Sequence, residues 1–192
     1  MTEGINWRSP LPLYDPGAER FLDPKDFYRL DDRAPGSDER AAYSSDGIPV
    51  FIHPSRISEV DEYWHKDPYV AEASEDQTNP FAQWRFAQTA KLIDRNIKKI
   101  ERSLTILDVA CGKGTITKQL RSRFPQAEIV GFDNSLTAIR LALRDNPSVS
   151  FAVADVYQPP FPDHVFDLAV FNNIWEHVPS PISMLNAIKR CL

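Results

Sequence analysis

Three acidic side chains follow apolar segments in the second half of the sequence, at positions where they could contact a nucleoside. Asp108 lies in the segment LTILDVA, Asp133 ends EIVGFD, and Asp155 follows VSFAVA. A carboxylate at the end of a strand can accept two hydrogen bonds from the vicinal hydroxyls of a ribose, and another can accept one from an exocyclic amine. Between the first two acids, Gly112 and Gly114 permit a tight turn that brings backbone amides close to a ligand. Together, these residues predict a nucleoside-binding site.

Each of these residues also has a purely structural explanation. An aspartate after a strand is often a turn or helix-cap residue, and it is the combination of the three acids that favours a ligand site. The segment GKGT lacks the spacing of a phosphate-binding P-loop, and DVACGKG lacks the complete GxGxxG of a dinucleotide site, which an NAD-dependent oxidoreductase would need. Cys111 has no cluster of metal-ligand residues beside it, so a small packing residue is favoured over a nucleophile and no metal site is predicted.

The segments around these acids alternate between apolar runs and amphipathic stretches. The expected strands are residues 104–109, 128–132, 149–153 and 166–171, and the expected helices are residues 79–102, 115–124, 135–145 and 180–191. Continuous apolar strands are typical of a parallel sheet that is covered by helices on both faces. The predicted fold class is therefore α/β, a doubly wound, mostly parallel open sheet, in which ligands bind beyond the carboxyl ends of the strands.

The first 78 residues differ from the rest in composition. They hold many of the 16 prolines and most of the acidic side chains, which favours irregular or extended backbone. Within them, residues 43–52 predict a turn at Asp46 and Gly47 that leads into a short strand, and residues 58–66 predict a short helix. We expect an irregular, Pro-rich N-terminal extension over residues 1–78, which acts as a substrate lid region, and a ligand-binding domain over residues 79–192.

Composition and charge exclude several classes of protein. The chain of 192 residues has a net charge of -5 and no block of lysine or arginine, so it carries no clear nucleic-acid footprint. It has no run of about 18 apolar residues, so no membrane span is predicted. Two cysteines, and a first segment without a basic start and an apolar run, favour a reducing, cytoplasmic location.

Three segments, in this order along the chain, resemble the motifs of a known family. They are DVACGKG, GFDNSLTAIRLA and ADVYQPPFPDHVFDLAVFNNIWEHVPSP, and the resemblance extends from about Phe81 to Leu192. The family is that of the class I S-adenosylmethionine-dependent methyltransferases, in particular small-molecule enzymes similar to those of ubiquinone and menaquinone biosynthesis. The resemblance implies a Rossmann-like sheet with strand order 3-2-1-4, and an enzyme that transfers a methyl group from S-adenosylmethionine to a small-molecule acceptor.

The resemblance also implies roles for individual residues. Asp133 would hold the ribose, Asp155 and Val156 would frame the adenine, and Asn172 would lie beside the sulfonium and the acceptor. Ala110 stands where the family usually has a glycine, which adds one methyl group to the turn. The residues implied in cofactor binding are Asp108, Ala110, Gly112, Gly114, Asp133, Asn134, Asp155, Val156 and Asn172. The first four of these would line the methionine part of the cofactor.

A proton acceptor is needed in methyl transfer only when the nucleophile is a poor one. Glu176 and His177, in the segment NIWEHV, are the catalytic candidates, because a histidine titrates near neutrality and can take a proton from a phenol or hydroxyl. The alternative is that both residues begin a helix and form local hydrogen bonds.

The sheet of the family usually continues for three more strands beyond the point where this chain ends. The sequence therefore indicates a C-terminally incomplete fold, in which residues 166–171 form an apolar edge that favours self-association or a partner chain. An alternative function follows from this edge, namely a catalytically silent, truncated methyltransferase-like module that acts through partner binding.

Overall fold

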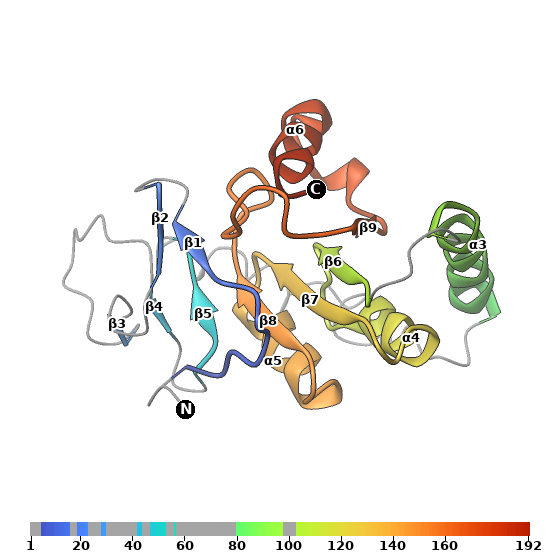
Figure 1. Ribbon diagram of the computed structural model, residues 1–192, viewed down its shortest axis with the longest axis horizontal. Coiled ribbons are helices and arrows are strands. Elements are labelled where there is room, and N and C mark those ends of the chain that lie inside the picture. Colours follow the sequence, from blue (N-terminus) through green and yellow to red (C-terminus); the bar gives the residue numbers. More distant parts are fainter. Residues whose placement is uncertain are drawn as a thin grey trace.

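A parallel sheet forms the centre of the computed structural model, which describes residues 5–15, 19–22, 28–29, 42–43, 47–52, 56, 80–97 and 103–192. Four strands from the second half of the chain lie side by side in the order β8, β7, β6, β9, and all of them are parallel (Figure 1). Their bounds are β6 Thr105–Val109, β7 Glu128–Asp133, β8 Ser150–Val153 and β9 Leu168–Phe171. The predicted open α/β sheet and its strand order 3-2-1-4 are confirmed.

Helices lie on both faces of this sheet (Figure 1). On one face lie α4, Thr115–Arg123, and α5, Leu136–Asp145, and on the other lies α6, Pro181–Cys191. A further helix, α3, Pro80–Ile97, is placed beside α4, and its Ile93 belongs to the same apolar cluster as the buried residues of α4 and α5. The sheet is thus sandwiched between helices, as its apolar strands predict.

Two apolar clusters form because successive side chains of a strand point to opposite faces of the sheet. In β6, Ile106 belongs to the cluster of α4 and α5, whereas Leu107 belongs to the cluster of α6. In β7, Gly131 leaves room for the ring of Phe151 from β8, since a Cβ at Gly131 would lie 2.7 Å from that ring. Both faces of each central strand are therefore closely packed.

The predicted boundaries of these strands and helices agree with the structure to within two residues from position 103 onward. At α5 the agreement has a clear cause, because the Ser135 hydroxyl caps the helix by accepting a hydrogen bond from the Ala138 amide over 3.1 Å. α3 begins at Pro80, as expected for proline at a first helical position. Residues 98–102, the predicted end of that helix, and the predicted helix over residues 58–66 lie outside the described residues.

The N-terminal region extends the sheet beyond β8. Its strand β5, Pro49–Val50, pairs in parallel with β8, and the sheet continues with β4, Ala42–Tyr43, and β3, Tyr28–Arg29. The short strand predicted within residues 43–52 is therefore confirmed. Gly47 has a left-handed φ of 76°, as a turn before that strand requires, while Asp46 lies outside the described residues.

An extended segment, residues 5–15, runs along the sheet beside β5 and β8 (Figure 1). The Ser150 hydroxyl in β8 accepts hydrogen bonds from two successive backbone amides of this segment, at 2.8 and 2.7 Å. Trp7 stacks on Phe161, and Leu13 is buried in the cluster of α6. The segment ends in an antiparallel pair, β1 Tyr14–Asp15 and β2 Arg20–Phe21. Part of the face on which α6 lies is thus covered by extended chain rather than by a helix.

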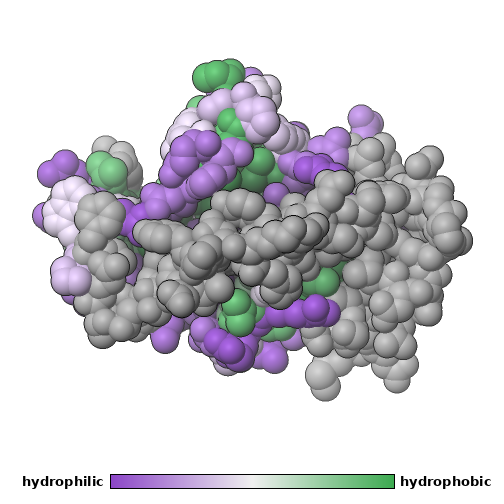
Figure 2. All heavy atoms as spheres, turned by 180° about the vertical axis from the view of Figure 1, so that it is seen from behind, coloured by the Kyte–Doolittle hydropathy of each residue, from purple (hydrophilic) through white to green (hydrophobic). Residues whose placement is uncertain are grey.

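At the opposite end of the sheet, β9 is the last of the described strands and pairs with β6. Val170 is buried, and the other residues of β9 are partly exposed. Hydrophobic surface is visible over the neighbouring α6 (Figure 2), where Ile182 is 69% exposed. Association through this edge stays a prediction. None of the described helices combines the length and the apolar character needed to cross a bilayer.

Candidate functional site

Asp133 ends β7 and is held in place by two backbone amides. Its Oδ2 accepts a hydrogen bond from the Gly112 amide over 3.0 Å, and its Oδ1 accepts one from the Ser135 amide over 3.0 Å. The first bond ties the end of β7 to the turn after β6, and the second ties it to the start of α5. Since Asp133 is only 7% exposed, the orientation of its carboxylate is set before any ligand arrives.

The turn between β6 and α4 contains three residues in the left-handed conformation. Ala110 and Gly112 each have a φ of 53°, and Gly114 has a φ of 78°. Glycine adopts this conformation freely, whereas an alanine there costs about 1–2 kcal/mol because its Cβ approaches the following carbonyl oxygen. Gly114 is the N-cap residue of α4, so the turn leads directly into the helix and the first amides of α4 lie at the turn.

Gly114 also lies against α5. The Nδ2 group of Asn146, at the C-cap of α5, donates a hydrogen bond to the Gly114 carbonyl over 3.3 Å. A Cβ at Gly114 would lie 2.8 Å from that Nδ2 and 3.0 Å from the Cβ of Ala142. The turn that carries the predicted methionine-side residues is therefore fixed by packing as well as by its own backbone.

Asp108 is a buried carboxyl group within β6. Its Oδ2 accepts a hydrogen bond from the Thr117 hydroxyl of α4 over 2.5 Å, and both residues are almost completely buried. Burial raises the pKa of Asp108 to about 7; the Thr117 hydroxyl opposes this shift, and the nearby charge of Asp133 adds to it. The site thus holds one carboxyl group that changes charge near neutrality.

Cys111 packs in the same turn. Its side chain is buried in the cluster of α4 and α5, and burial raises the pKa of its thiol well above the usual range, with the charges of Asp108 and Asp133 adding to the effect. A thiol that resists ionisation is a poor nucleophile and a poor metal ligand. The burial is consistent with the predicted packing role.

Asp155 follows β8 and contacts a residue from the N-terminal region. Its Oδ2 lies 2.6 Å from Nη1 of Arg56 in an ion pair, and its Oδ1 accepts a hydrogen bond from the Tyr157 amide over 3.0 Å. The Ala154 amide, one residue earlier, donates to the Asp133 carbonyl over 2.9 Å. The predicted ribose and adenine acids therefore lie at the ends of two hydrogen-bonded strands.

Val156 and Asn134 complete the predicted cofactor set on this side. Val156 packs against the apolar cluster of α6 and is partly buried. Asn134 is partly buried between Asp133 and the N-cap of α5. Both lie at the carboxyl edge of the sheet.

The loop after β9 carries the remaining predicted residues. Asn172 follows β9 directly and is partly exposed, and the adjacent Asn173 has a left-handed φ of 55°. Glu176 and His177 lie in a single 3₁₀ turn, Trp175–His177, and both side chains are mainly exposed. Their Oε1 and Nε2 atoms are 4.0 Å apart, which is too long for a hydrogen bond.

This loop is tied to the loop after β8. The Ser180 amide, at the N-cap of α6, donates a hydrogen bond to the Tyr157 hydroxyl over 3.0 Å. In turn, Trp175 lies against the ring of Phe171, with ring centroids 6.0 Å apart. The loop that carries Glu176 therefore contacts both the loop after β8 and strand β9.

The predicted site residues gather along one edge of the sheet, because four parallel strands end there. Three residues that contact the site were not among the predicted site residues. Thr117 contacts Asp108 from within α4, Tyr157 links two loops, and Arg56 reaches Asp155 from 99 positions away in the chain.

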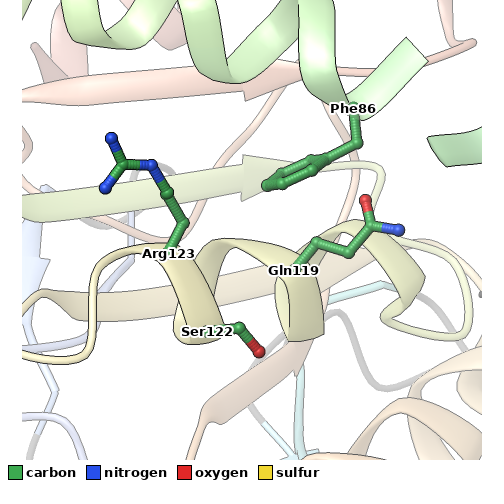
Figure 3. A pocket seen from close by; sticks show the side chains of 4 residues that line it. All are labelled: Phe86, Gln119, Ser122 and Arg123. Carbon is green, nitrogen blue, oxygen red and sulfur yellow. The ribbon is translucent and has the colours of Figure 1, made fainter. Parts of the chain in front are cut away.

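A separate cavity of about 320 Å³ lies between α3 and α4 (Figure 3). Phe86 of α3 and the side chains of Gln119, Ser122 and Arg123 of α4 line it. Arg123 also pairs with Asp94 of α3 over 2.9 Å. None of the predicted site residues lines this cavity, so it is distinct from the edge where the strands end.

The described strands form an open, parallel α/β sheet with acidic side chains at the strand ends, and comparisons with known proteins show what the chain is similar to. The family model described as "Methyltransferase domain" matches residues 106–192. An uncharacterized methyltransferase of Schizosaccharomyces pombe is 30% identical over 135 residues, which are 65% of this chain and 45% of that protein. A trans-aconitate 2-methyltransferase of Methylobacterium nodulans is 31% identical over 120 residues, 58% of this chain and 46% of that protein. The chain thus spans about half the length of these relatives.

Two solved structures are similar to this chain in fold. The PH0226 protein of Pyrococcus horikoshii is 27% identical, with a TM-score of 0.51 over 68% of this chain and 60% of that one. The plantazolicin methyltransferase BamL, solved with a substrate analogue and SAH, is 20% identical, with a TM-score of 0.56 over 71% of this chain and 52% of that one, and it shows the fold alone. Residues 106–192 therefore match a methyltransferase family model, and their open parallel sheet is similar to that of the PH0226 protein. The narrower resemblance to ubiquinone and menaquinone enzymes stays a prediction.

Proposed function

We propose that the protein is an S-adenosylmethionine-dependent methyltransferase that acts on a small-molecule acceptor. The observation that carries the proposal is the fixed carboxylate of Asp133, which the amides of Gly112 and Ser135 orient at the end of β7. The match of residues 106–192 to a methyltransferase family model supports the same activity. No observation favours the alternative of a catalytically silent module.

The donor groups at the strand ends fit S-adenosylmethionine. Asp133 ends β7, where a carboxylate can accept hydrogen bonds from the two vicinal hydroxyls of a ribose. Asp155 and Val156 would frame the adenine. Residues 110–114 and Asp108 would face the methionine part, whose ammonium group a buried carboxylate suits. When bound, this cofactor supplies a methyl group on a positively charged sulfur, ready for displacement.

The contribution of the protein is mainly alignment and the exclusion of water. The turn at Ala110, Gly112 and Gly114 is held in place, because the Gly112 amide donates to Asp133 and Asn146 donates to the Gly114 carbonyl. Asn172 would lie beside the sulfonium and the acceptor at the end of β9. Such a site would hold the methyl donor and the acceptor in line. The reaction would then not depend on a rare encounter of the two molecules in the correct orientation in solution.

Glu176 and His177 would serve as proton acceptors if the acceptor is a hydroxyl or phenol. Both side chains are mainly exposed and lie directly after β9. Because they make no hydrogen bond to each other at 4.0 Å, either is able to reorient toward an acceptor. A carboxylate acceptor would need no such base, since it is already ionised at neutral pH.

The relatives suggest a chemical class for the acceptor. Several relatives of 30–37% identity are trans-aconitate 2-methyltransferases, so small carboxylic acids are the first class to screen. The N-terminal region, residues 1–78, would form part of the wall around the acceptor. The boundary at residue 78 and the cytoplasmic location remain predictions.

The test uses Asp133→Asn, which keeps the shape of the side chain. We expect the variant to bind S-adenosylhomocysteine about 10- to 100-fold more weakly, because a hydrogen bond to a charged group contributes about 1.5–3 kcal/mol. Asp145→Asn is the matched control, since Asp145 is an exposed acid at the end of α5. Release of S-adenosylhomocysteine from S-adenosylmethionine, with trans-aconitate and related acids as acceptors, measures turnover. Wild-type affinity in the folded Asp133→Asn variant would contradict the assigned ribose contact.

A further inference from the structure

The N-terminal region reaches the cofactor side of the sheet through β5. β5 pairs in parallel with β8, with Val50 opposite Val153, and the Phe51 amide donates a hydrogen bond to the Val153 carbonyl over 2.8 Å. Parallel strands end at the same edge of a sheet. The chain that leaves β5 therefore emerges beside Asp155, which lies two positions after Val153.

Arg56 uses this position to contact Asp155. Its Nη1 lies 2.6 Å from Oδ2 of Asp155, while the Tyr157 amide binds the other carboxylate oxygen. The Arg56 side chain is 53% exposed, whereas that of Asp155 is 18% exposed. One oxygen is thus held by the backbone of the β8 loop, and the other is held from outside by a cation of the N-terminal region.

We propose that Arg56 is a positioning residue of the cofactor site, which holds Asp155 in the orientation that reads the 6-amino group of adenine. This inference rests on the proposed methyltransferase function. Oδ2 of a carboxylate has two lone pairs, so it accepts one hydrogen bond from Arg56 and a second from an amine. The Tyr157 amide holds only one oxygen of the Asp155 carboxylate. Arg56 holds the other oxygen, so the carboxylate group cannot rotate.

The opposite role would be competition, in which Arg56 occupies the place of the base and must leave before the cofactor binds. The two roles predict opposite changes when Arg56 is removed. A positioning residue strengthens binding of a base that carries the amino group, whereas a competitor weakens it. The sign of the change in affinity therefore separates them.

The expected effect follows from the exposure of the pair. An exposed ion pair contributes up to about 1 kcal/mol, which corresponds to about a fivefold change in affinity. The effect should shrink at high salt, because the Debye length falls to about 3 Å at 1 M.

The experiment measures the affinity of two ligands by isothermal titration. One is S-adenosylhomocysteine, and the other is its purine analogue, in which hydrogen replaces the 6-amino group. Arg56→Met is the variant, because it keeps much of the length of the side chain without the charge. Arg144→Met is the matched control, since Arg144 forms a comparably exposed ion pair with its neighbour Asp145, 2.8 Å apart, outside the site. Thermal unfolding confirms that each variant is folded.

We expect Arg56→Met to bind S-adenosylhomocysteine about fivefold more weakly and to bind the purine analogue with wild-type affinity. The preference for the amino group then falls about fivefold, while Arg144→Met leaves it unchanged. In an Asp155→Asn background, Arg56→Met should have no further effect. Tighter binding by Arg56→Met, or an unchanged preference, would overturn the positioning role while leaving the proposed function intact. If the wild-type protein binds neither ligand, both proposals fail.

Discussion

The buried carboxyl group of Asp108 makes the stability of the protein depend on pH in a defined direction. Its pKa is raised from 3.8 to about 7 in the folded protein, mainly by burial. Between these values the folded protein keeps a proton that the unfolded chain has released, so this group destabilises the fold as pH rises from about 4 to about 7. A shift of about three units corresponds to about 4 kcal/mol.

Asp108→Asn removes this titration and keeps the shape of the side chain. The free energy of unfolding of the variant, relative to wild type, should therefore rise by roughly 2 to 3 kcal/mol between about pH 5 and about pH 8. Urea denaturation across this range measures it. Any cost of placing the new amide group beside Thr117 is independent of pH, so the slope is the diagnostic quantity rather than the absolute stability.

Asp145→Asn is the control for this experiment. The pKa of Asp145 is lowered, chiefly by its hydrogen bond to Arg144, so the group is ionised throughout the range and its contribution should not change there. A difference between Asp108→Asn and wild type that is constant from about pH 5 to about pH 8 would refute the reasoning.

Three further predictions concern the turn after β6 and the loop after β8. Gly114→Ala should lower the free energy of unfolding by about 1–3 kcal/mol in urea denaturation, because of its left-handed φ and the close Asn146 side chain; an unchanged stability would contradict this. Ala110→Gly should raise the free energy of unfolding by up to about 1 kcal/mol, since the relief of backbone strain exceeds the entropy that glycine adds to the unfolded chain. A lower free energy of unfolding would show that the Ala110 methyl group makes stabilising contacts. Tyr157→Phe should cost about 1 kcal/mol and speed hydrogen exchange at the Ser180 amide, whereas unchanged exchange would argue against that bond.

The sheet of the second half of the chain was predictable from sequence because local and global signals agree there. The apolar run that ends at Asp133 has no polar face. Such a strand must therefore be buried on both faces of the sheet. Ser135 caps α5 and Pro80 begins α3, so helix starts were also encoded locally. The positions of the acids at the strand ends follow from the alternation of strands and helices along the sequence.

The contacts made by the N-terminal region could not be predicted in the same way. The short strand β5 was predicted, but its partner in β8 is about a hundred positions away, so no local pattern specifies this pairing. The ion pair of Arg56 with Asp155 depends on that pairing and has no local signal. The Thr117 hydroxyl is similar, because only the packing of α4 on β6 brings it to Asp108.

The central claim is that the strand ends of this chain form a cofactor site, and isothermal titration of the 192-residue protein with S-adenosylmethionine and S-adenosylhomocysteine tests it most directly. The preset carboxylate of Asp133 and the rigid turn at Gly112 predict binding of one molecule per chain, with micromolar affinity or about -8 kcal/mol. Absence of heat from either ligand, with a chain that circular dichroism shows to be folded, would contradict the account.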